Sequence, residues 1–337
     1  MQTSDWFRHE VTTHLVRTHM VEEAIIVSAN RQLPPEHPVF RILCPHWQKT
    51  LALNGAARST LVPKVILNIV GFDKDQAISF IRDEYSSFDF ENSYVPKDLR
   101  RRGSSPEELN DKKFHNYTYA RCINSMWNKI REYVEEILFL DYTGPIVDQQ
   151  VKDDKFIDNW CREMRCRDGA HLPNFPRIKT FEALVDCVTM AIHLASPQHT
   201  AVNYLQDYYQ CFVINKPSCL FAKPPGTLEE PLGYKESHLV EALPMNQPHV
   251  WLLSSHVPYL LSFKPKQSET LIGCIYTMWK ASKNNGDSKR TAALSKFYKA
   301  LVDSKQEFEG YAGEKNDSRV SRYEVLEPEH NAVSILI

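Results

Sequence analysis

The sequence predicts a mainly α-helical protein. Long segments that lack glycine and carry apolar residues at helical spacing cover residues 5–30, 119–140 and 181–214. The composition fits a folded chain, because 42% of the 337 residues are hydrophobic and only 11 are glycine. Residues 61–70 fit a short strand or an apolar arm instead. The fold class that follows is a helical one, with at most a minor extended segment.

Local signals set the expected ends of these helices. Asp5 is a candidate N-cap for the first helix, which ends before Pro34. Thr180 is a candidate cap for residues 181–214, and Pro197 should kink that helix because proline lacks the backbone donor. A solvated loop is expected where a triple arginine occurs, although the arginines also allow an anion-binding patch. That loop covers residues 98–113, and further helices are expected at 155–165, 234–243, 269–283 and 289–310.

Charge and cysteine content exclude several classes of function. The net charge is -2, from 40 basic and 42 acidic residues, so no overall field selects a nucleic acid or an anionic membrane. No apolar run reaches the roughly 18 residues that span a bilayer, and no leader precedes the first helix. The eight cysteines are scattered, and Cys161 and Cys166 lack the spacing and histidine partners of a zinc site. A soluble, cytoplasmic protein with reduced cysteines is expected.

Two histidines on the first helix are candidate metal ligands. His9 and His14 are five residues apart, which places them about 140° apart on a regular α-helix. They bind one metal only if a π-bulge realigns them, a distortion that often marks functional sites. The alternative is that both are core histidines satisfied by hydrogen bonds.

A second candidate pair and the chain terminus supply further ligands. His199 and Asn203, four residues apart, project from one face of a helix and together suit a first-row transition metal. Packing with a local hydrogen bond is the alternative for this pair. The chain ends on an apolar run that stops at Ile337, and a buried terminal carboxylate requires a cation. That cation is a metal, an Arg or a Lys, unless the tail is exposed.

These residues belong to six segments that together resemble one family. The first reads His9-Glu-Val-Thr-Thr-His14-Leu-Val-Arg-Thr-His19 and resembles the metal-binding helix of lipoxygenases. The fourth, His199-Thr-Ala-Val-Asn203-Tyr-Leu-Gln206, resembles that family's second metal helix. All six occur in the family's order, at residues 9–19, 31–46, 54–58, 199–206, 323–328 and 334–337.

The resemblance implies a fold, a ligand set and a cofactor. The fold would be the helical lipoxygenase catalytic domain, built around two long metal-binding helices. Iron is the metal that the resemblance favours, and manganese, used by some fungal members, is the alternative. Gln206 would hydrogen-bond the Asn ligand. Ala57 would influence the stereochemistry of oxygenation, unless it is only a small residue that permits close packing. Glu10 stands where the family often has Gln. The implied metal ligands are His9, His14, His199, Asn203 and the carboxylate of Ile337.

The function that the resemblance implies is dioxygenation of a polyunsaturated fatty acid such as linoleate. A bis-allylic hydrogen is removed, O2 adds to the resulting radical, and a hydroperoxide forms. Residues 1–337 would be a single, N-terminally truncated catalytic domain without the lipid-binding β-sandwich of plant and animal relatives. An incomplete, inactive homologue that retains only metal or lipid binding is the alternative. Secretion also remains open, because a leader would lie in the missing portion, and membrane contact would be peripheral at most.

Overall fold

The computed structural model describes residues 6–203 and 206–337, and within them the fold is helical with no strand. A single antiparallel bridge joins Thr270 to Ala332. Three π-helical stretches are present: η1 (Arg8–Met20), η3 (Ala57–Leu61) and η8 (Leu194–Gln198). The first α-helices are α1 (Val21–Gln32), α2 (Pro38–Leu43), α3 (Thr50–Ala56), α4 (Val62–Lys64), α5 (Lys74–Ser86), α6 (Val95–Arg101), α7 (Thr118–Leu138) and α8 (Val147–Asp153). The others are α9 (Lys155–Arg165), α10 (Phe181–His193), α11 (His199–Asn203), α12 (Gln206–Tyr209), α13 (Glu236–Ala242), α14 (Pro248–Leu261), α15 (Leu271–Asn284) and α16 (Ser288–Gly313).

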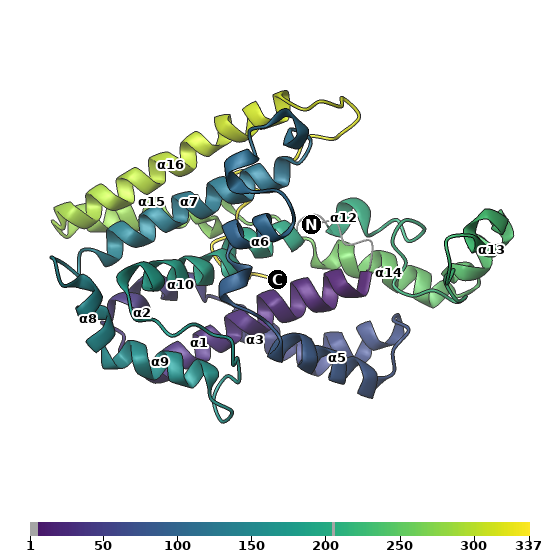
Figure 1. The fold of residues 1–337 in the computed structure, drawn as a ribbon, viewed down its shortest axis with the longest axis horizontal. Helices are drawn as coiled ribbons and strands as arrows, with labels where there is room; N and C mark the ends of the chain where they lie inside the picture. The colour runs from purple at the N-terminus through teal and green to yellow at the C-terminus, as the bar shows by residue number, and fades with distance from the viewer. Residues whose placement is uncertain (1–5, 204–205) are drawn as a thin grey trace.

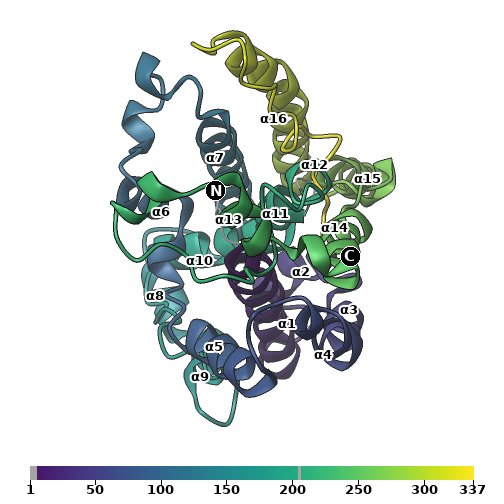
Figure 2. The ribbon, with the colours of Figure 1, turned by 90° about the vertical axis from the view of Figure 1, so that its right-hand side faces the viewer.

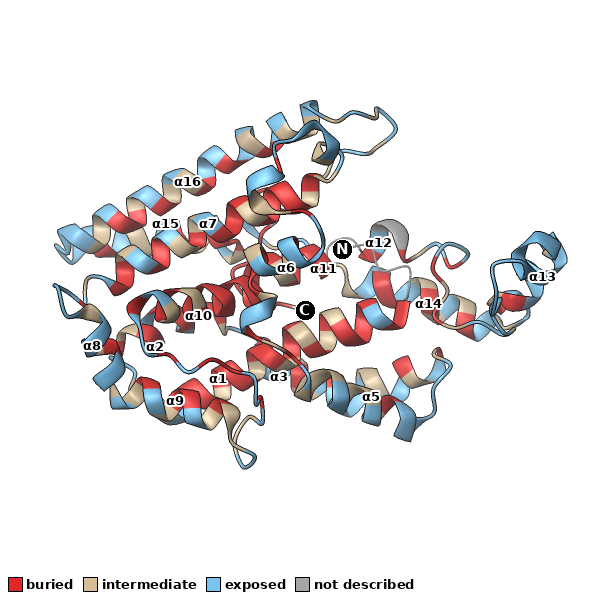
Figure 3. Ribbon diagram, in the orientation of Figure 1, coloured by how far each residue is buried: buried red, intermediate tan, exposed pale blue. Residues whose placement is uncertain are grey.

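The helices pack in layers around α10. Helices α15, α16 and α7 lie side by side, and α7 in turn packs on α10 (Figure 1). On the other side, η1 continues directly into α1, which packs against α9, while α5 lies along η1 (Figure 2). Helix α13 stands away from this body and is exposed along nearly all its length (Figure 3). No helix among the described residues is both long and apolar enough to cross a bilayer.

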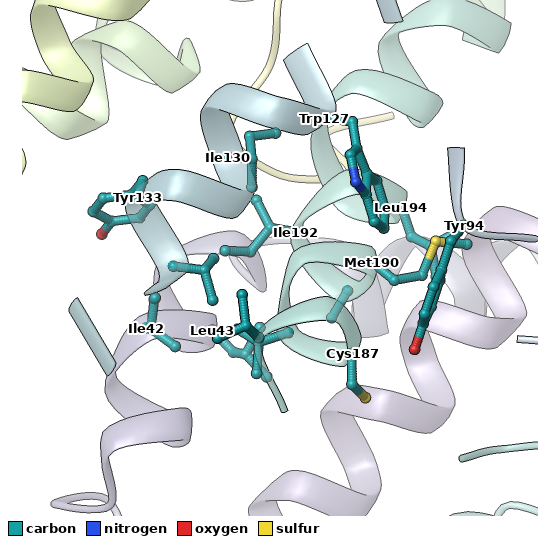
Figure 4. Close-up of a cluster of buried hydrophobic side chains, with 14 of the residues drawn as sticks. Ile42, Leu43, Tyr94, Trp127, Ile130, Tyr133, Cys187, Met190, Ile192 and Leu194 are labelled. Atoms are coloured by element: carbon teal, nitrogen blue, oxygen red, sulfur yellow. The ribbon is translucent and has the colours of Figure 1, made fainter. Parts of the chain in front are cut away.

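The main core lies between α2, α7 and α10. Ile130 and Ile192 are buried there and face each other across the α7–α10 contact (Figure 4). Trp127 and Leu194 continue the same cluster toward η8. Burial of this apolar surface stabilises the fold at roughly 25 cal/mol per Å². The core therefore fixes α10, and with it the segment that follows α10 in the chain.

Most of the expected helices are present, with informative changes at their edges. The first segment is helical throughout its described part, from Trp6 onward, whereas the candidate cap Asp5 lies outside the described residues. Pro197 interrupts residues 181–214 by lying inside the π-helical stretch η8. The tail from residue 333 to 336 is buried, and the eight cysteines are free thiols.

Two expectations from the sequence are corrected. Residues 61–70 form short helical turns, including α4, and neither a strand nor an extended arm. Residues 98–101 belong to α6. Pro96 lies in the first turn of that helix, where proline is favoured, and Asp98 pairs with Arg101 and Arg102. The third arginine, Arg100, pairs with Glu107 in the turn that follows, so all three arginines are compensated by nearby carboxylates. Only the remainder of residues 98–113 is loop and short 3₁₀ turns.

Asp154 ties α9 to the segment that leads into α2. Its side chain caps α9 by accepting hydrogen bonds from the backbone N–H groups of Phe156 and Ile157. Its other oxygen accepts from Tyr142 at 2.8 Å and from His37 Nε2 at 3.1 Å. Partial burial opposes ionisation of this carboxyl, but the hydrogen bonds from His37 and Tyr142 outweigh it and lower the pKa of Asp154 to about 2.

We expect Asp154→Ala to lower the free energy of unfolding by about 1–2 kcal/mol at pH 7, because a helix cap and two side-chain bonds are lost. The lowered pKa means that this stabilisation is present above the unfolded pKa of about 3.9 and disappears as the pH falls toward 2. Urea unfolding at pH 7, 4 and 3 measures the difference between variant and parent. Asp153→Ala, at the neighbouring exposed position, is the control and should change stability by less than about 0.5 kcal/mol. A pH-independent effect of Asp154→Ala would contradict this account.

Candidate metal centre

Three buried imidazoles converge at one point of the structure. The Nε2 atoms of His14 and His19 are 3.1 Å apart, and each lies close to Nε2 of His199, at 3.3 Å and 3.1 Å respectively. Each side chain is at most 7% exposed. The three donor atoms therefore face one another in a site that is closed to bulk solvent.

The π-helical backbone of η1 brings two of these imidazoles to the same side. In a π-helix the hydrogen bonds run from residue i to residue i+5, so residues five apart share a face. The N–H of Val21, at the end of η1, bonds to the carbonyl of Val16 in this way. The hydroxyl of Thr18 also reaches back to the carbonyl of Thr13. His14 and His19 consequently point together, where a regular α-helix would turn them apart.

His19 is held by a side-chain amide. Its Nδ1 lies 2.7 Å from Oδ1 of Asn54, whose Nδ2 donates to the backbone carbonyl of His19 and to Glu23. Because both donor bonds of the amide are used, Oδ1 is the atom that faces His19, and the His19 Nδ1 carries the proton. Arg58 completes the chain by an ion pair with Glu23. The lone pair of His19 is thereby directed to Nε2, into the cluster.

His14 contacts a buried carboxylate. Its Nδ1 lies 3.3 Å from Oε2 of Glu10 and 2.8 Å from Nε2 of Gln206. Gln206 also donates to Glu10 at 3.3 Å, and Gln210 donates to the other oxygen of Glu10 at 2.8 Å. Burial opposes ionisation of Glu10, yet the hydrogen bond with His14 and the bond from Gln210 leave its pKa below the ordinary value.

His199 connects the cluster to the chain terminus. It hydrogen-bonds the backbone of Ile337, and it lines a small cavity together with Asn203 and Leu336. The Nδ2 of Asn203 donates to the carbonyl of Leu261, which leaves Oδ1 as the amide atom available to a cation. The second pair expected from the sequence and the terminus thus lie beside the three imidazoles.

Backbone hydrogen bonds hold the tail in place. Ser196 donates to the carbonyl of Ala332, while the N–H of Ala332 donates to the hydroxyl of Thr200. His46 bonds the carbonyl of Val333 at 2.7 Å, and the N–H of Val333 donates to the carbonyl of Glu269. The tail is anchored to η8, α11 and the segment after α2, so that its last residue reaches His199.

Burial keeps the imidazoles of His19 and His199 neutral. Desolvation, reinforced by the nearby His14, lowers the pKa of His19 to about 3. Desolvation and the two neighbouring imidazoles also place the pKa of His199 well below its ordinary value. Neutral imidazoles at neutral pH carry the lone pairs that a metal ligand needs.

The donor set fits a metal ion. A metal about 2.0–2.1 Å from two imidazole nitrogens separates them by roughly 3.0–3.4 Å, depending on the angle between the bonds. The measured separations of 3.1–3.3 Å fall in that interval. Three neutral imidazoles joined by hydrogen bonds alone would leave lone pairs opposed to one another, which a cation at their centre relieves. The group His14, His19 and His199 is therefore a plausible metal-binding set.

The structure places His9 outside this cluster. Its Nε2 lies 3.0 Å from the carbonyl of Val202, and burial lowers its pKa to about 4. The third imidazole is His19, which is not among the metal ligands that the resemblance implies. Both His9–His14 and His14–His19 are five residues apart, so the spacing does not distinguish them. The structure does, because the ring of His19 is held by Asn54 with its Nε2 in the cluster, whereas Nε2 of His9 lies against Val202.

The remaining expected residues lie close to this region. Gln206 contacts His14 and Glu10, whereas the resemblance placed its hydrogen bond on Asn203. Ala57 is buried and is the first residue of the π-helical turn η3, three residues after Asn54. Ala57 therefore lies close in the chain to Asn54, which holds His19. Among the described contacts it makes no direct bond to the cluster.

A cavity of about 970 Å³ opens next to the site. Its lining includes His9 from η1 and Ala201 and Val202 from α11, together with apolar side chains such as Leu99 and Ile123. Its volume lies within the range of pockets that bind small organic ligands. His9 and Val202, which contact each other, thus connect the wall of this cavity with the two elements that carry the converging imidazoles.

Comparison with known proteins gives consistent matches. The family model described as Lipoxygenase matches residues 1–318. The manganese lipoxygenase of Pleurotus sapidus is 49% identical over 271 residues, which cover 80% of this chain and 42% of that protein. Linoleate 9S-lipoxygenase 5 of Arabidopsis thaliana is 31% identical over 232 residues, which cover 66% of this chain and 26% of that protein.

Solved structures agree with the sequence matches. The crystal structure of a fungal lipoxygenase from Fusarium graminearum superposes with a TM-score of 0.90 at 40% identity. The superposition covers 98% of this chain and 55% of that one. The chain therefore spans about half the length of the relatives that it matches, or less.

We expect His19→Gln to weaken metal binding at least tenfold, because one of three converging donors is lost. His9→Gln is the matched control, since it removes a buried histidine of the same π-helix whose Nε2 lies 3.0 Å from the carbonyl of Val202 and 3.7 Å from Oε1 of Glu10, outside the cluster. Competition between the protein and a fluorescent chelator for Mn²⁺ measures the affinity of parent and variants. If His9→Gln lost the metal and His19→Gln kept it, the assignment of the cluster would be overturned.

Proposed function

Because the chain belongs to the lipoxygenase family, we propose that it is a non-haem metal dioxygenase that oxygenates a polyunsaturated fatty acid. The observation that carries this proposal is the convergence of three buried imidazoles beside the C-terminal tail. A fatty acid of the linoleate type, with O2 as the second substrate, agrees with the name of the Arabidopsis thaliana relative.

The proposed ligands are His14, His19, His199, the Oδ1 of Asn203 and the terminal carboxylate of Ile337. Three imidazoles with one amide oxygen and one carboxylate suit a first-row ion of intermediate hardness, such as iron or manganese. The name of the Pleurotus sapidus relative supports manganese. We propose that residues 1–337 form a single catalytic domain that holds one such ion.

When bound, the metal supplies one-electron redox chemistry for removing a bis-allylic hydrogen, after which O2 adds to the carbon radical. The residues around it prepare the site for that chemistry. Asn54 holds the His19 proton on Nδ1, and the fully buried surroundings keep His199 neutral. The apolar tail and α11 exclude water from the imidazoles, so the ligands are not protonated from solvent.

The terminus gives the sharpest test of this proposal. We expect deletion of Ile337, or one added residue after it, to abolish conjugated-diene formation from linoleate, because the proposed carboxylate ligand is lost or displaced. The assay follows diene absorbance with the purified chain loaded with Fe²⁺ or Mn²⁺. Full activity in either variant would rule out the terminal carboxylate as a ligand.

The parent protein in the same assay separates two candidate functions. Metal binding with diene formation supports the dioxygenase. Metal binding without diene formation favours a homologue that retains only metal or lipid binding. This second candidate is tested because the chain covers only part of the relatives' length.

We expect Ala57→Gly to shift the ratio of R to S hydroperoxides. The methyl group of a buried alanine screens one end of a pentadienyl radical from O2, and glycine removes that screen. Chiral chromatography of the products measures the ratio. An unchanged ratio would leave Ala57 as a small residue that permits close packing of η3.

A further inference from the structure

Glu10 is a buried carboxylate against the proposed metal ligands. The residue is 5% exposed and lies on η1, one helical turn before His14. Gln210 donates to its Oε1 at 2.8 Å and Gln206 donates to its Oε2 at 3.3 Å. Both oxygens are thus used as acceptors, and Oε2 is also the atom 3.3 Å from Nδ1 of His14.

The proton position on His14 decides what Glu10 does. If Nε2 of His14 binds a metal, its lone pair is on Nε2 and Nδ1 carries the proton. A protonated Nδ1 must then donate a hydrogen bond, because it is buried. Glu10 Oε2 is an acceptor within reach, whereas Gln206 presents its own donor, Nε2, to the same ring nitrogen at 2.8 Å.

The alternative orientation of the Gln206 amide is unfavourable. Turning it would place its oxygen at the position 3.3 Å from Oε2 of Glu10, and two acceptors would oppose each other. If Gln206 keeps the orientation described, a proton on Nδ1 of His14 repels the Nε2 donor of Gln206. Gln206 then donates to Glu10 alone. Glu10 then accepts from both side chains.

We propose that Glu10 is a positioning residue that fixes the tautomer of His14 and, through its negative charge, makes His14 the most strongly donating of the three imidazoles. A carboxylate that accepts from the outer nitrogen of a metal-bound histidine raises the basicity of that ligand. This role rests on the proposed metal site.

The three imidazoles differ in their outer partners. His19 donates to a neutral amide, Asn54, whereas His14 meets a carboxylate. The negative charge of Glu10 attracts a cation at the cluster and favours its higher oxidation state. Glu10 therefore acts on metal affinity and on reduction potential together.

The test compares two buried glutamates. Glu10→Gln keeps the size of the side chain, and the Oε1 of Gln210, which has no partner, is available to accept from the new amide. Glu22→Gln is the matched control, because Glu22 is also fully buried on the same continuous helix, and desolvation raises its pKa well above the ordinary value. The Mn²⁺ dissociation constant of each full-length protein is measured by chelator competition, and the metal-centred reduction potential by redox titration.

We expect Glu10→Gln to weaken Mn²⁺ binding about 10–100-fold and to raise the reduction potential, while Glu22→Gln changes neither. Glu10→Asp restores the charge and should recover part of both properties, which a purely structural role would not produce; it also serves if Glu10→Gln does not fold. Affinity and potential of Glu10→Gln equal to the parent would overturn the role of Glu10. A parent that binds no Mn²⁺ would instead overturn the proposed metal site, and this role with it.

Discussion

The surrounding structure depends on one constraint, the convergence of three buried imidazole nitrogens within about 3 Å of one another. It requires a backbone that presents residues five apart on one face, and η1 meets that requirement over its whole length. π-Helical turns are rarely stable in isolation, so the neighbouring elements must hold this one. Helix α5 on one side and α11 on the other supply that support.

Each imidazole meets a different partner. An amide held by its own two donor bonds orients His19, a buried carboxylate orients His14, and the chain terminus meets His199. These partners come from three separate segments of the chain, α3, η1 and the tail. A substitution at any partner changes a ring orientation or tautomer without touching the donor atoms themselves.

The sequence predicted the helical class, the two helices that carry the histidines, and the burial of the apolar tail. Periodicity and proline positions are local properties, and they place α7, α9 and α16 within a few residues. The third imidazole was not predictable in this way, because His9 and His19 stand at equal distances from His14 along the chain. The choice depends on Asn54, which is 35 residues from His19 in sequence and adjacent to it in space. The second half of α6, residues 98–101, was expected to be loop because three consecutive arginines resemble a solvated loop, and their pairing with Asp98 and Glu107 depends on the folded geometry.

The same long-range character couples metal binding to folding. His14 and His19 lie 185 and 180 residues from His199, and the tail returns from the far end of the chain to meet them. An ion held by these segments joins distant parts of the chain, and because the unfolded chain does not form the site, the ion stabilises only the folded state. Its binding free energy is then part of the stability of η1, α11 and the tail at once. Glu10 adds to this coupling, because its bonds to Gln206 and Gln210 bring α12 and the residue after it against the π-helix that carries His14.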